Sequence, residues 1–147
     1  RINLWTGRTD ACLDLGENTS PWQFNAAQEY DTHAWVTGWV SGEIIEVDLD
    51  DMSVVRRATA GPGAEGSLVT EDHVAVTLAG YNGAENVYEH GEVVVFDKST
   101  LTEVARLEVP PNAQYIFTGA DGRYAGCITQ SGITHLLGET YRRPAAA

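Results

Sequence analysis

Residues 91–110 read GEVVVFDKSTLTEVARLEVP, and the fold can be inferred outward from this stretch. It opens with a glycine and a short β-branched run, which Asp97 closes. A polar turn follows and ends at Leu101, and a second strand-like run spans Glu103–Val109. Two such runs joined by a polar turn are typical of a β-hairpin, because β-branched residues favour extended backbone and polar residues favour turns.

The same order of features occurs earlier in the chain. Residues 42–58 read GEIIEVDLDDMSVVRRA, which is a glycine, an apolar run, Asp48, an acidic turn, Met52 and a second run. A supersecondary unit that recurs in this way indicates a repeat architecture. The repeat therefore says more about how the chain folds than about any chemistry that it performs.

Strand-like runs separated by turn residues also fill the rest of the chain, and no segment shows the 3.6-residue period of a helix. The sequence therefore predicts an all-β protein with one longer loop at residues 79–90. The expected strands are 2–6, 11–15, 22–26, 33–40, 43–47, 54–59, 67–70, 73–78, 92–96, 103–109, 114–118, 124–129, 133–137 and 140–143.

Three six-residue runs align with one another: THAWVT at 32–37, DHVAVT at 72–77 and YAGCIT at 124–129. Each ends in a threonine at the end of a second strand, and these threonines are 40 and 52 residues apart. Four short strands per round, with a period of about 40–50 residues, are typical of the blades of a β-propeller. A sheet this small cannot bury both faces alone, so we expect the blades to stack.

The order of apolar run, aspartate, turn, Leu or Met and second strand, in IIEVDLDDMSVVRR and VVVFDKSTLTEVARL, resembles the YVTN-type β-propeller repeat. More narrowly, residues 53–110 are similar to a blade of the heavy subunit of quinoprotein amine dehydrogenases. In that family the heavy subunit is a scaffold, and the quinone cofactor lies in a small, cysteine-rich partner subunit. The resemblance implies a scaffold chain with no cofactor of its own, in the periplasm or outside the cell.

We expect one all-β repeat domain over residues 1–143 and a tail at 144–147. Its blade units would be a partial one at 1–17 and then 18–60, 61–110 and 111–143, about three and a half blades. Propellers generally need at least four blades to close. The ring should therefore be completed by other copies of this chain, by another chain or by more of a longer polypeptide. The alternative fold is a β-trefoil, a three-fold arrangement of twelve strands.

The chain carries 21 acidic and nine basic residues, which gives a formal net charge of −12. A surface this acidic repels phosphate backbones and anionic lipids, so neither nucleic acid nor a membrane is expected as a partner. No apolar run approaches the ~18 residues that a membrane span needs. Solubility explains the acidity without a specific partner.

Motifs typical of phosphate or metal sites are weak in this sequence. The glycines of residues 61–66, GPGAEG, fit a dinucleotide-binding pattern, but a strand rather than a helix follows, so we expect a turn. Asp48, Asp50 and Asp51 are better explained as an acidic hairpin turn than as calcium ligands. No catalytic residue and no metal ligand is therefore predicted.

The histidines and cysteines also have simple explanations. His33 and His73 occupy equivalent repeat positions, so the repeat explains them better than a metal does. Cys12 and Cys127 either join the two ends of the domain or are separate buried thiols. We favour the buried thiols, because each cysteine lies in a strand-like apolar stretch.

In stacked blades, the loops after the second strands and after the fourth strands share one rim, where binding residues concentrate. Aromatic rings combined with amide and imidazole groups suit a polar small molecule, a glycan or a partner protein. The alternative is that the two tyrosines only pack the loop against the protein. The candidate ligand-binding residues are Trp39, Tyr81, Asn82, Asn86, Tyr88 and His90.

The sequence thus predicts a non-catalytic β-propeller module that binds or scaffolds through one rim. The alternative is a scaffold subunit or fragment of a periplasmic quinoprotein amine dehydrogenase. Other residues expected on the same rim are Asn18, Ser41, Glu65, Asn112, Gln130 and Ser131.

Overall fold

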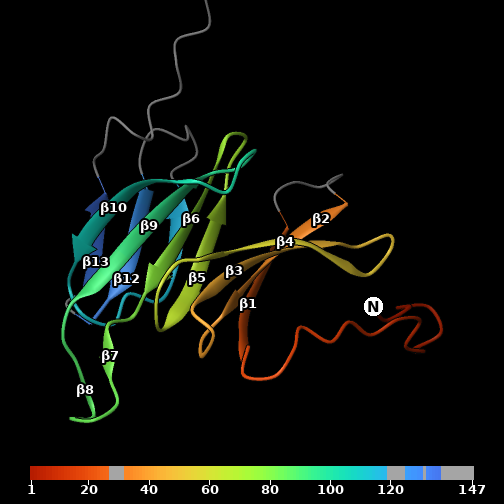
Figure 1. Ribbon diagram of the computed structural model, residues 1–147, viewed down its shortest axis with the longest axis horizontal. Coiled ribbons are helices and arrows are strands. Elements are labelled where there is room, and N and C mark those ends of the chain that lie inside the picture. The colour runs from red at the N-terminus through yellow and green to blue at the C-terminus, as the bar shows by residue number, and fades with distance from the viewer. Residues whose placement is uncertain (27–31, 119–124, 131, 137–147) are drawn as a thin grey trace, which may run out of the picture.

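The computed structural model describes residues 1–26, 32–118, 125–130 and 132–136. Every regular element in these residues is a β-strand, as the sequence predicts. The strands form two four-stranded antiparallel sheets, one three-stranded sheet and one two-stranded hairpin. The three larger sheets follow one another across the molecule (Figure 1). No helix in the described part of the chain is long and apolar enough to cross a membrane.

The first sheet has the order β1-β2-β3-β4. Its strands are β1 (Pro21–Ala26), β2 (His33–Gly38), β3 (Glu43–Asp48) and β4 (Ser53–Thr59). The second sheet, of order β10-β9-β6-β5, consists of β5 (Ala64–Val69), β6 (His73–Leu78), β9 (Gly91–Asp97) and β10 (Glu103–Val109). The third is β11 (Ile116–Thr118), β12 (Ala125–Thr129) and β13 (Gly132–Leu136).

Each large sheet is an up-and-down meander whose strands pair antiparallel with their neighbours. The predicted loop at 79–90 contains the small hairpin of β7 (Tyr81–Asn82) and β8 (Val87–Tyr88), inserted between β6 and β9. The propeller-like blades are therefore confirmed. The β-trefoil alternative is wrong, because these are separate sheets that pack face to face. The expected strand at 140–143 lies outside the described residues.

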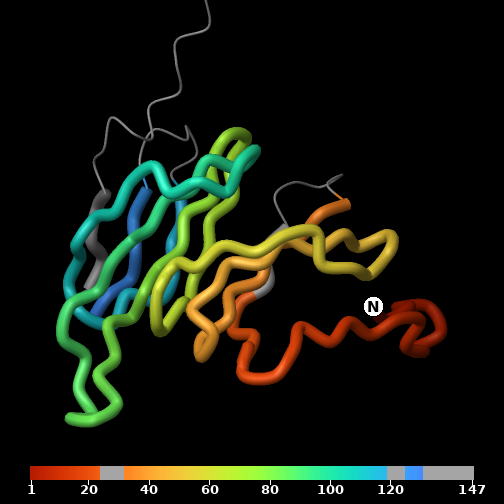
Figure 2. The backbone as a smooth tube through the Cα atoms, viewed as in Figure 1, coloured from red at the N-terminus to blue at the C-terminus, as the bar shows by residue number. Residues whose placement is uncertain are grey.

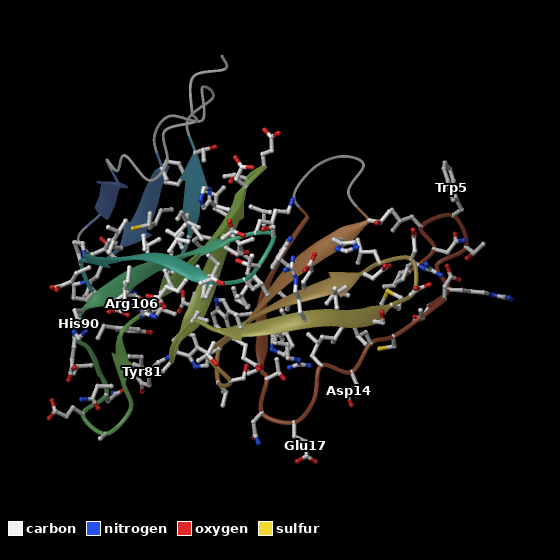
Figure 3. The ribbon with its side chains drawn as sticks, turned by 45° about the horizontal axis from the view of Figure 1, so that its top comes forward. Trp5, Asp14, Glu17, Tyr81, His90 and Arg106 are labelled. Carbon is white, nitrogen blue, oxygen red and sulfur yellow. The ribbon has the colours of Figure 1, made fainter. Side chains whose placement is uncertain are left out.

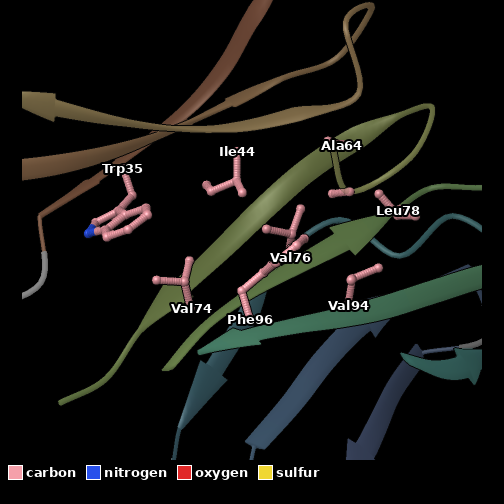
Figure 4. Packing of buried hydrophobic residues seen from close by; sticks show 9 residues of the cluster. Trp35, Ile44, Ala64, Val74, Val76, Leu78, Val94 and Phe96 are labelled. Carbon is pink, nitrogen blue, oxygen red and sulfur yellow. The ribbon is translucent and has the colours of Figure 1, made fainter. Parts of the chain in front are cut away.

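The first core lies between the first and second sheets (Figure 4). Trp35 and Ile44 of the first sheet pack with Val74, Val76 and Phe96 of the second, and none of these five is more than 2% exposed. Fully burying side chains of this size contributes roughly 1.5–3 kcal/mol each. Every second residue of β6 and β9 therefore faces the first sheet, and these apolar side chains hold the two sheets together.

The second core lies on the opposite face of the second sheet. Ala75, Val93 and Val95 contact Ile116 and Cys127 of the third sheet. The second sheet buries both faces because it has a neighbour on each side. This is the expected behaviour of a stacked blade.

The repeated aspartates each stabilise a turn. Asp97 Oδ1 accepts hydrogen bonds from the backbone N–H groups of Ser99 (3.0 Å) and Thr100 (2.9 Å). The two hydroxyls of Ser99 and Thr100 also donate to it, and together these bonds lower the pKa of Asp97 to about 2. Leu101 closes the turn with a φ of 54°. The left-handed backbone at Leu101 helps to reverse the chain, so that β10 can pair antiparallel with β9.

The earlier repeat has the same turn. Asp48 Oδ1 accepts from the N–H groups of Asp50 (2.8 Å) and Asp51 (3.0 Å), which lowers the pKa of Asp48. Met52 has a φ of 52°, like its counterpart Leu101. The acidic hairpin turn predicted for these aspartates is therefore confirmed.

The strand register corrects the alignment of the third repeat. Trp39, Ala79 and Gln130 each donate a backbone N–H to the segment before the first strand of their own sheet, at 2.9, 3.0 and 2.8 Å. These three donors occupy equivalent positions, and so do the residues two positions before them in each sheet. Those residues are Thr37, Thr77 and Ile128, not Thr129. Thr129 ends β12, as predicted, but it lies one position beyond the residue that is equivalent to Thr37 and Thr77.

The two expected strands at 2–6 and 11–15 are absent, and one isolated bridge joins Ile2 to Thr9. Local polar contacts prevent the strands. Asn3 Oδ1 accepts from the N–H groups of Trp5 and Thr6, and Asp14 Oδ1 accepts from Gly16 N–H. These bonds turn the chain where the apolar pattern predicts extension. Figure 2 shows the N-terminal segment running beside the first sheet as an irregular tube.

The segment still covers part of the protein. Leu13 and Leu15 pack against Val36, Ile45 and Val47 on the face of the first sheet that points away from the second. The apolar residues of 11–15 are therefore buried against a sheet without joining one.

The cysteines are both free. Cys127 is buried, as predicted, and its burial raises the pKa of the thiol. The prediction is wrong for Cys12, which is exposed because residues 11–15 are not a strand. His33 and His73 are equivalent, as predicted, because they pair with Asp48 and Asp97 across the neighbouring strand.

Arginines link the neighbouring sheets. Arg56 of β4 contacts Glu46 in its own sheet and donates from Nη2 to the carbonyl of Lys98 in the second, 2.6 Å away. Arg106 of β10 reaches back to the carbonyl of Ala60 at 3.0 Å. Arg56 thus reaches from the first sheet to the second, and Arg106 reaches from the second sheet back to the end of the first.

Candidate functional site

The loops at one edge of the stacked sheets are hydrogen-bonded in series. Gly63 N–H donates to Trp39 O at 3.2 Å, and Ala79 N–H donates to Gly63 O at 3.0 Å. Asn112 N–H then donates to Ala79 O at 2.9 Å. The loops from successive sheets therefore form one continuous edge, which we call the rim. The β7–β8 hairpin projects from it (Figure 1).

Four aromatic side chains form a line along the rim, the aromatic strip. The ring centroids of Trp22 and Trp39 are 5.4 Å apart, those of Trp39 and Tyr81 are 6.3 Å apart, and those of Tyr81 and Tyr88 are 5.3 Å apart. Each pair is tilted, by 36°, 39° and 52°. The strip therefore crosses from the first sheet to the hairpin of the second.

Much of this aromatic surface faces solvent. Trp22 is 59% exposed, Tyr81 is 40% exposed and Tyr88 is 36% exposed. Trp39 is half-buried and lies between them. Centroid distances of this size are typical of favourable tilted ring pairs, so the rings support one another while their outer faces stay accessible.

The polar groups of the hairpin are used mainly to hold it in shape. The Tyr81 hydroxyl donates to Asn86 Oδ1 at 3.0 Å, and Asn82 Nδ2 donates to Glu89 Oε1 at 2.6 Å. Asn82 Oδ1 in turn accepts the N–H of Ala84 at 3.1 Å. The amides predicted to contact a ligand are thus already hydrogen-bonded within the hairpin, while the two tyrosine rings remain partly exposed.

The base of the hairpin requires a glycine. Gly80 has a φ of 72°, and a Cβ placed there would lie 1.7 Å from the carbonyl oxygen of His90. His90 is exposed, and Figure 3 shows it beside Tyr81 at this end of the molecule. The close approach of residues 80 and 90 fixes the direction in which the hairpin leaves the rim.

The structure therefore places Trp39, Tyr81 and Tyr88 together, with Asn86 hydrogen-bonded to Tyr81 and Asn82 to Glu89. The sequence prediction placed Trp22 at the first position of a strand and did not include it among the candidate binding residues. The register of β1 slips between Pro21 and Phe24, and Trp22 lies in that irregularity. A tryptophan directly after a proline at a strand start was the available signal.

Glu65 is not on the surface of the rim, contrary to the prediction. It lies within β5, is 2% exposed, and its Oε2 has no hydrogen-bond partner among the described residues. Burial raises the pKa of this carboxyl to about 7. The cause of the burial is the position of β5, which packs beside both β1 and β11. Ser131 lies outside the described residues.

The charges around the strip have one sign. The rim segments 16–22, 39–42, 60–63, 79–90 and 110–113 contain no lysine and no arginine. Their carboxylates are Glu17, Glu85 and Glu89, and all three are exposed. Two guanidiniums reach these segments or their edges, Arg106 at the carbonyl of Ala60 and Arg57 at the carbonyl of Leu15. Both are paired with carboxylates, Arg106 with Glu92 at 2.6 Å and Glu103 at 2.8 Å, and Arg57 with Glu43 at 3.0 Å.

No family model and no curated relative matches the sequence. Among solved structures, the chain is similar to hydrazine synthase from Kuenenia stuttgartiensis, with a TM-score of 0.71 and 15% identity over 92% of this chain. It is also similar to the WD40 domain of Pan2 from Neurospora crassa, with a TM-score of 0.41 and 13% identity over 83% of this chain. The fold is β-propeller-like. The chain spans 37% of the length of the hydrazine synthase chain that it matches.

Proposed function

We propose that this β-propeller-like chain is a non-catalytic binding module, and that the aromatic strip is its binding surface. The observation that carries the proposal is the line of four rings, Trp22, Trp39, Tyr81 and Tyr88, on an exposed rim. Aromatic side chains supply a large contact area with few rotatable bonds, which is why they dominate many binding surfaces.

The hairpin bonds support the proposal because they restrain the tyrosines before any ligand arrives. Tyr81 is tied to Asn86, and the main chain of β7 pairs with that of β8. A surface that is already ordered loses less entropy on binding. The opposing interpretation, that the tyrosines only pack the hairpin, does not account for the two tryptophans that continue the line.

Fluorine NMR tests the proposal directly. The chain has four tryptophans, Trp5, Trp22, Trp35 and Trp39, and single Trp→Phe variants assign the signals of 5-fluorotryptophan. The labelled protein is titrated with a panel of neutral oligosaccharides, alkylamines, basic peptides and carboxylates. We expect at least one class to shift the signals of Trp22 and Trp39 and to leave Trp5, which is 97% exposed elsewhere, unmoved.

Tyr88→Ala with Trp22→Ala should then abolish the shift at Trp39. Trp5→Ala is the matched control and should keep it, because Figure 3 places Trp5 at the far end of the molecule from Tyr81. A panel that moves no strip signal, or that moves all four tryptophan signals alike, overturns the proposal.

Four more specific properties are proposed for this chain as well. They are the YVTN-type repeat, the role as scaffold in a quinoprotein amine dehydrogenase, the periplasmic or extracellular location and the completion of the ring by other copies or another chain. Solution mass by light scattering tests the last of these. A defined dimer or trimer supports ring sharing, and a stable monomer contradicts it.

A further inference from the structure

We infer that the ligand of the aromatic strip carries an alkylammonium group, an inference that rests on the proposed function. Two properties of the rim point to a cation. Its ring faces are the negative ends of aromatic quadrupoles, and its only fully charged side chains are carboxylates.

The ring geometry fits a cation. The centroids of Trp39 and Tyr81 are 6.3 Å apart, so a positive group above them lies within about 6 Å of both, the range in which a cation is attracted to a ring face. The pairs Trp22–Trp39 and Tyr81–Tyr88 are closer still, at 5.4 and 5.3 Å. An alkylammonium group seated between two neighbouring rings, on their exposed side, therefore contacts both rings at once.

The surrounding charge favours the same ligand. Glu85 and Glu89 lie on the same hairpin as Tyr81 and Tyr88, and Glu17 lies in the loop before Trp22. The guanidiniums that reach the rim are paired with carboxylates, Arg57 with Glu43 and Arg106 with Glu92 and Glu103. Glu89 accepts one bond from Asn82 at its Oε1. Since the whole chain has a net charge of −12, an anionic ligand would be repelled at long range and a cation attracted.

A neutral sugar fits less well. Sugar recognition needs several convergent polar groups besides the ring faces. The side chains that would supply them, Asn82 and Asn86, hydrogen-bond within the hairpin instead. What the strip offers is aromatic surface and negative charge, which are together complementary to a methylated or alkylated amine.

Such a group has two sources, a small amine or the lysine side chain of a partner protein. The test uses choline, a peptide with trimethyllysine, the unmodified lysine peptide and 3,3-dimethyl-1-butanol, which is the neutral isostere of choline. Binding is followed by the fluorotryptophan signals of the intact chain. We expect choline to shift Trp22 and Trp39 and to bind about tenfold more tightly than the isostere, because the cation is attracted to more than one ring.

Charge removal provides the second arm. Glu17→Gln with Glu85→Gln leaves every ring in place and should weaken choline binding about threefold at low salt. The matched control, Asp50→Asn with Asp51→Asn, removes the same charge from the turn between β3 and β4, at the other end of those strands, and should leave binding unchanged. A peptide that binds tenfold more tightly than choline identifies a protein partner, and equal affinity identifies a small amine.

The failures are distinguishable. If oligosaccharides shift the strip signals and choline does not, or if choline and its isostere bind equally, the alkylammonium inference is overturned while the binding module stands. If no compound in the panel shifts Trp22 or Trp39, the binding module itself is overturned as well.

Discussion

The hydroxyl of Thr77 donates a hydrogen bond to the backbone carbonyl of Gln114, 2.8 Å away in the segment that leads into the next sheet. The same oxygen accepts the N–H of Gly66, 2.7 Å away in its own sheet. Thr37 repeats this arrangement one sheet earlier, donating to the carbonyl of Glu65 and accepting from the N–H of Gln23. One buried threonine per junction therefore bonds both the first strand of its own sheet and the first strand of the next sheet, or the segment that leads into it.

Replacing Thr77 with valine should weaken the stack without changing the shape of the core. Valine keeps the volume but leaves a buried N–H and a buried carbonyl without this partner, which costs about 1–3 kcal/mol. Urea unfolding followed by tryptophan fluorescence measures the loss. Thr77→Ser should lose less, because the hydroxyl is retained.

Thr59→Val, an exposed position of β4, is the matched control and should change stability little. Equal stability of Thr77→Val and the parent protein would contradict the junction role of the hydroxyl.

Gly66 should tolerate no side chain. A Cβ at this position would lie 2.1 Å from the carbonyl oxygen of Gln114, so Gly66→Ala must push the second and third sheets apart. Overpacking of this kind typically costs about 1–3 kcal/mol. Gly83→Ala is the control, because its nearest neighbour is a Tyr81 ring carbon at 3.5 Å, an ordinary contact. Thermal unfolding of both variants gives the comparison, and similar melting temperatures would refute the close approach.

Glu65 should make the protein less stable as the pH rises. Its pKa is raised from 4.5 in the unfolded chain to about 7 in the folded one. The folded state therefore holds a proton that the unfolded state has released, so the free energy of unfolding falls between pH 4.5 and 7 and then levels off.

Glu65→Gln cannot ionise and should remove most of this fall, with a gain of the order of 1–3 kcal/mol at pH 8. Urea unfolding at a series of pH values measures it. Glu17→Gln, at an exposed position, should leave the slope unchanged. A parent protein with no loss of stability between pH 4.5 and 7 would show that the carboxyl is not protonated when buried.

Most of the strands could be predicted from the sequence because their information is local. The alternation of β6 and the Asp-to-Leu spacing around Asp97 are properties of a few neighbouring residues. The error in the third round came from Thr129, which imitates Thr77 in type although it is one position further along the strand. The shift is seen only in the backbone hydrogen bonds between strands, in which Gln130 takes the place of Trp39 and Ala79.

The site could be predicted in part. The expected series of loops does bring Trp39 and Tyr81 together, because it follows from the topology of the blades. Trp22 was missed because its orientation depends on the irregular register of β1. Glu65 was misplaced because residues 61–66 were predicted to be a turn, whereas β5 already begins at Ala64 and its neighbours enclose the side chain. Neither effect is encoded within a short stretch of sequence.

The N-terminal segment should stabilise the first sheet although it forms no strand. Leu13 and Leu15 cover Val36 and Ile45, and Arg57 Nη2 holds the segment by donating to the carbonyl of Leu15 at 2.7 Å. Leu15→Ala should cost roughly 1–2 kcal/mol, because the leucine is only partly buried, and it should expose an apolar sheet face that promotes self-association. Urea unfolding and light scattering measure the two effects. Leu4→Ala makes the same chemical change at a side chain that is 91% exposed and should alter neither. Identical behaviour of the two variants would show that residues 13–15 do not pack on the sheet in solution.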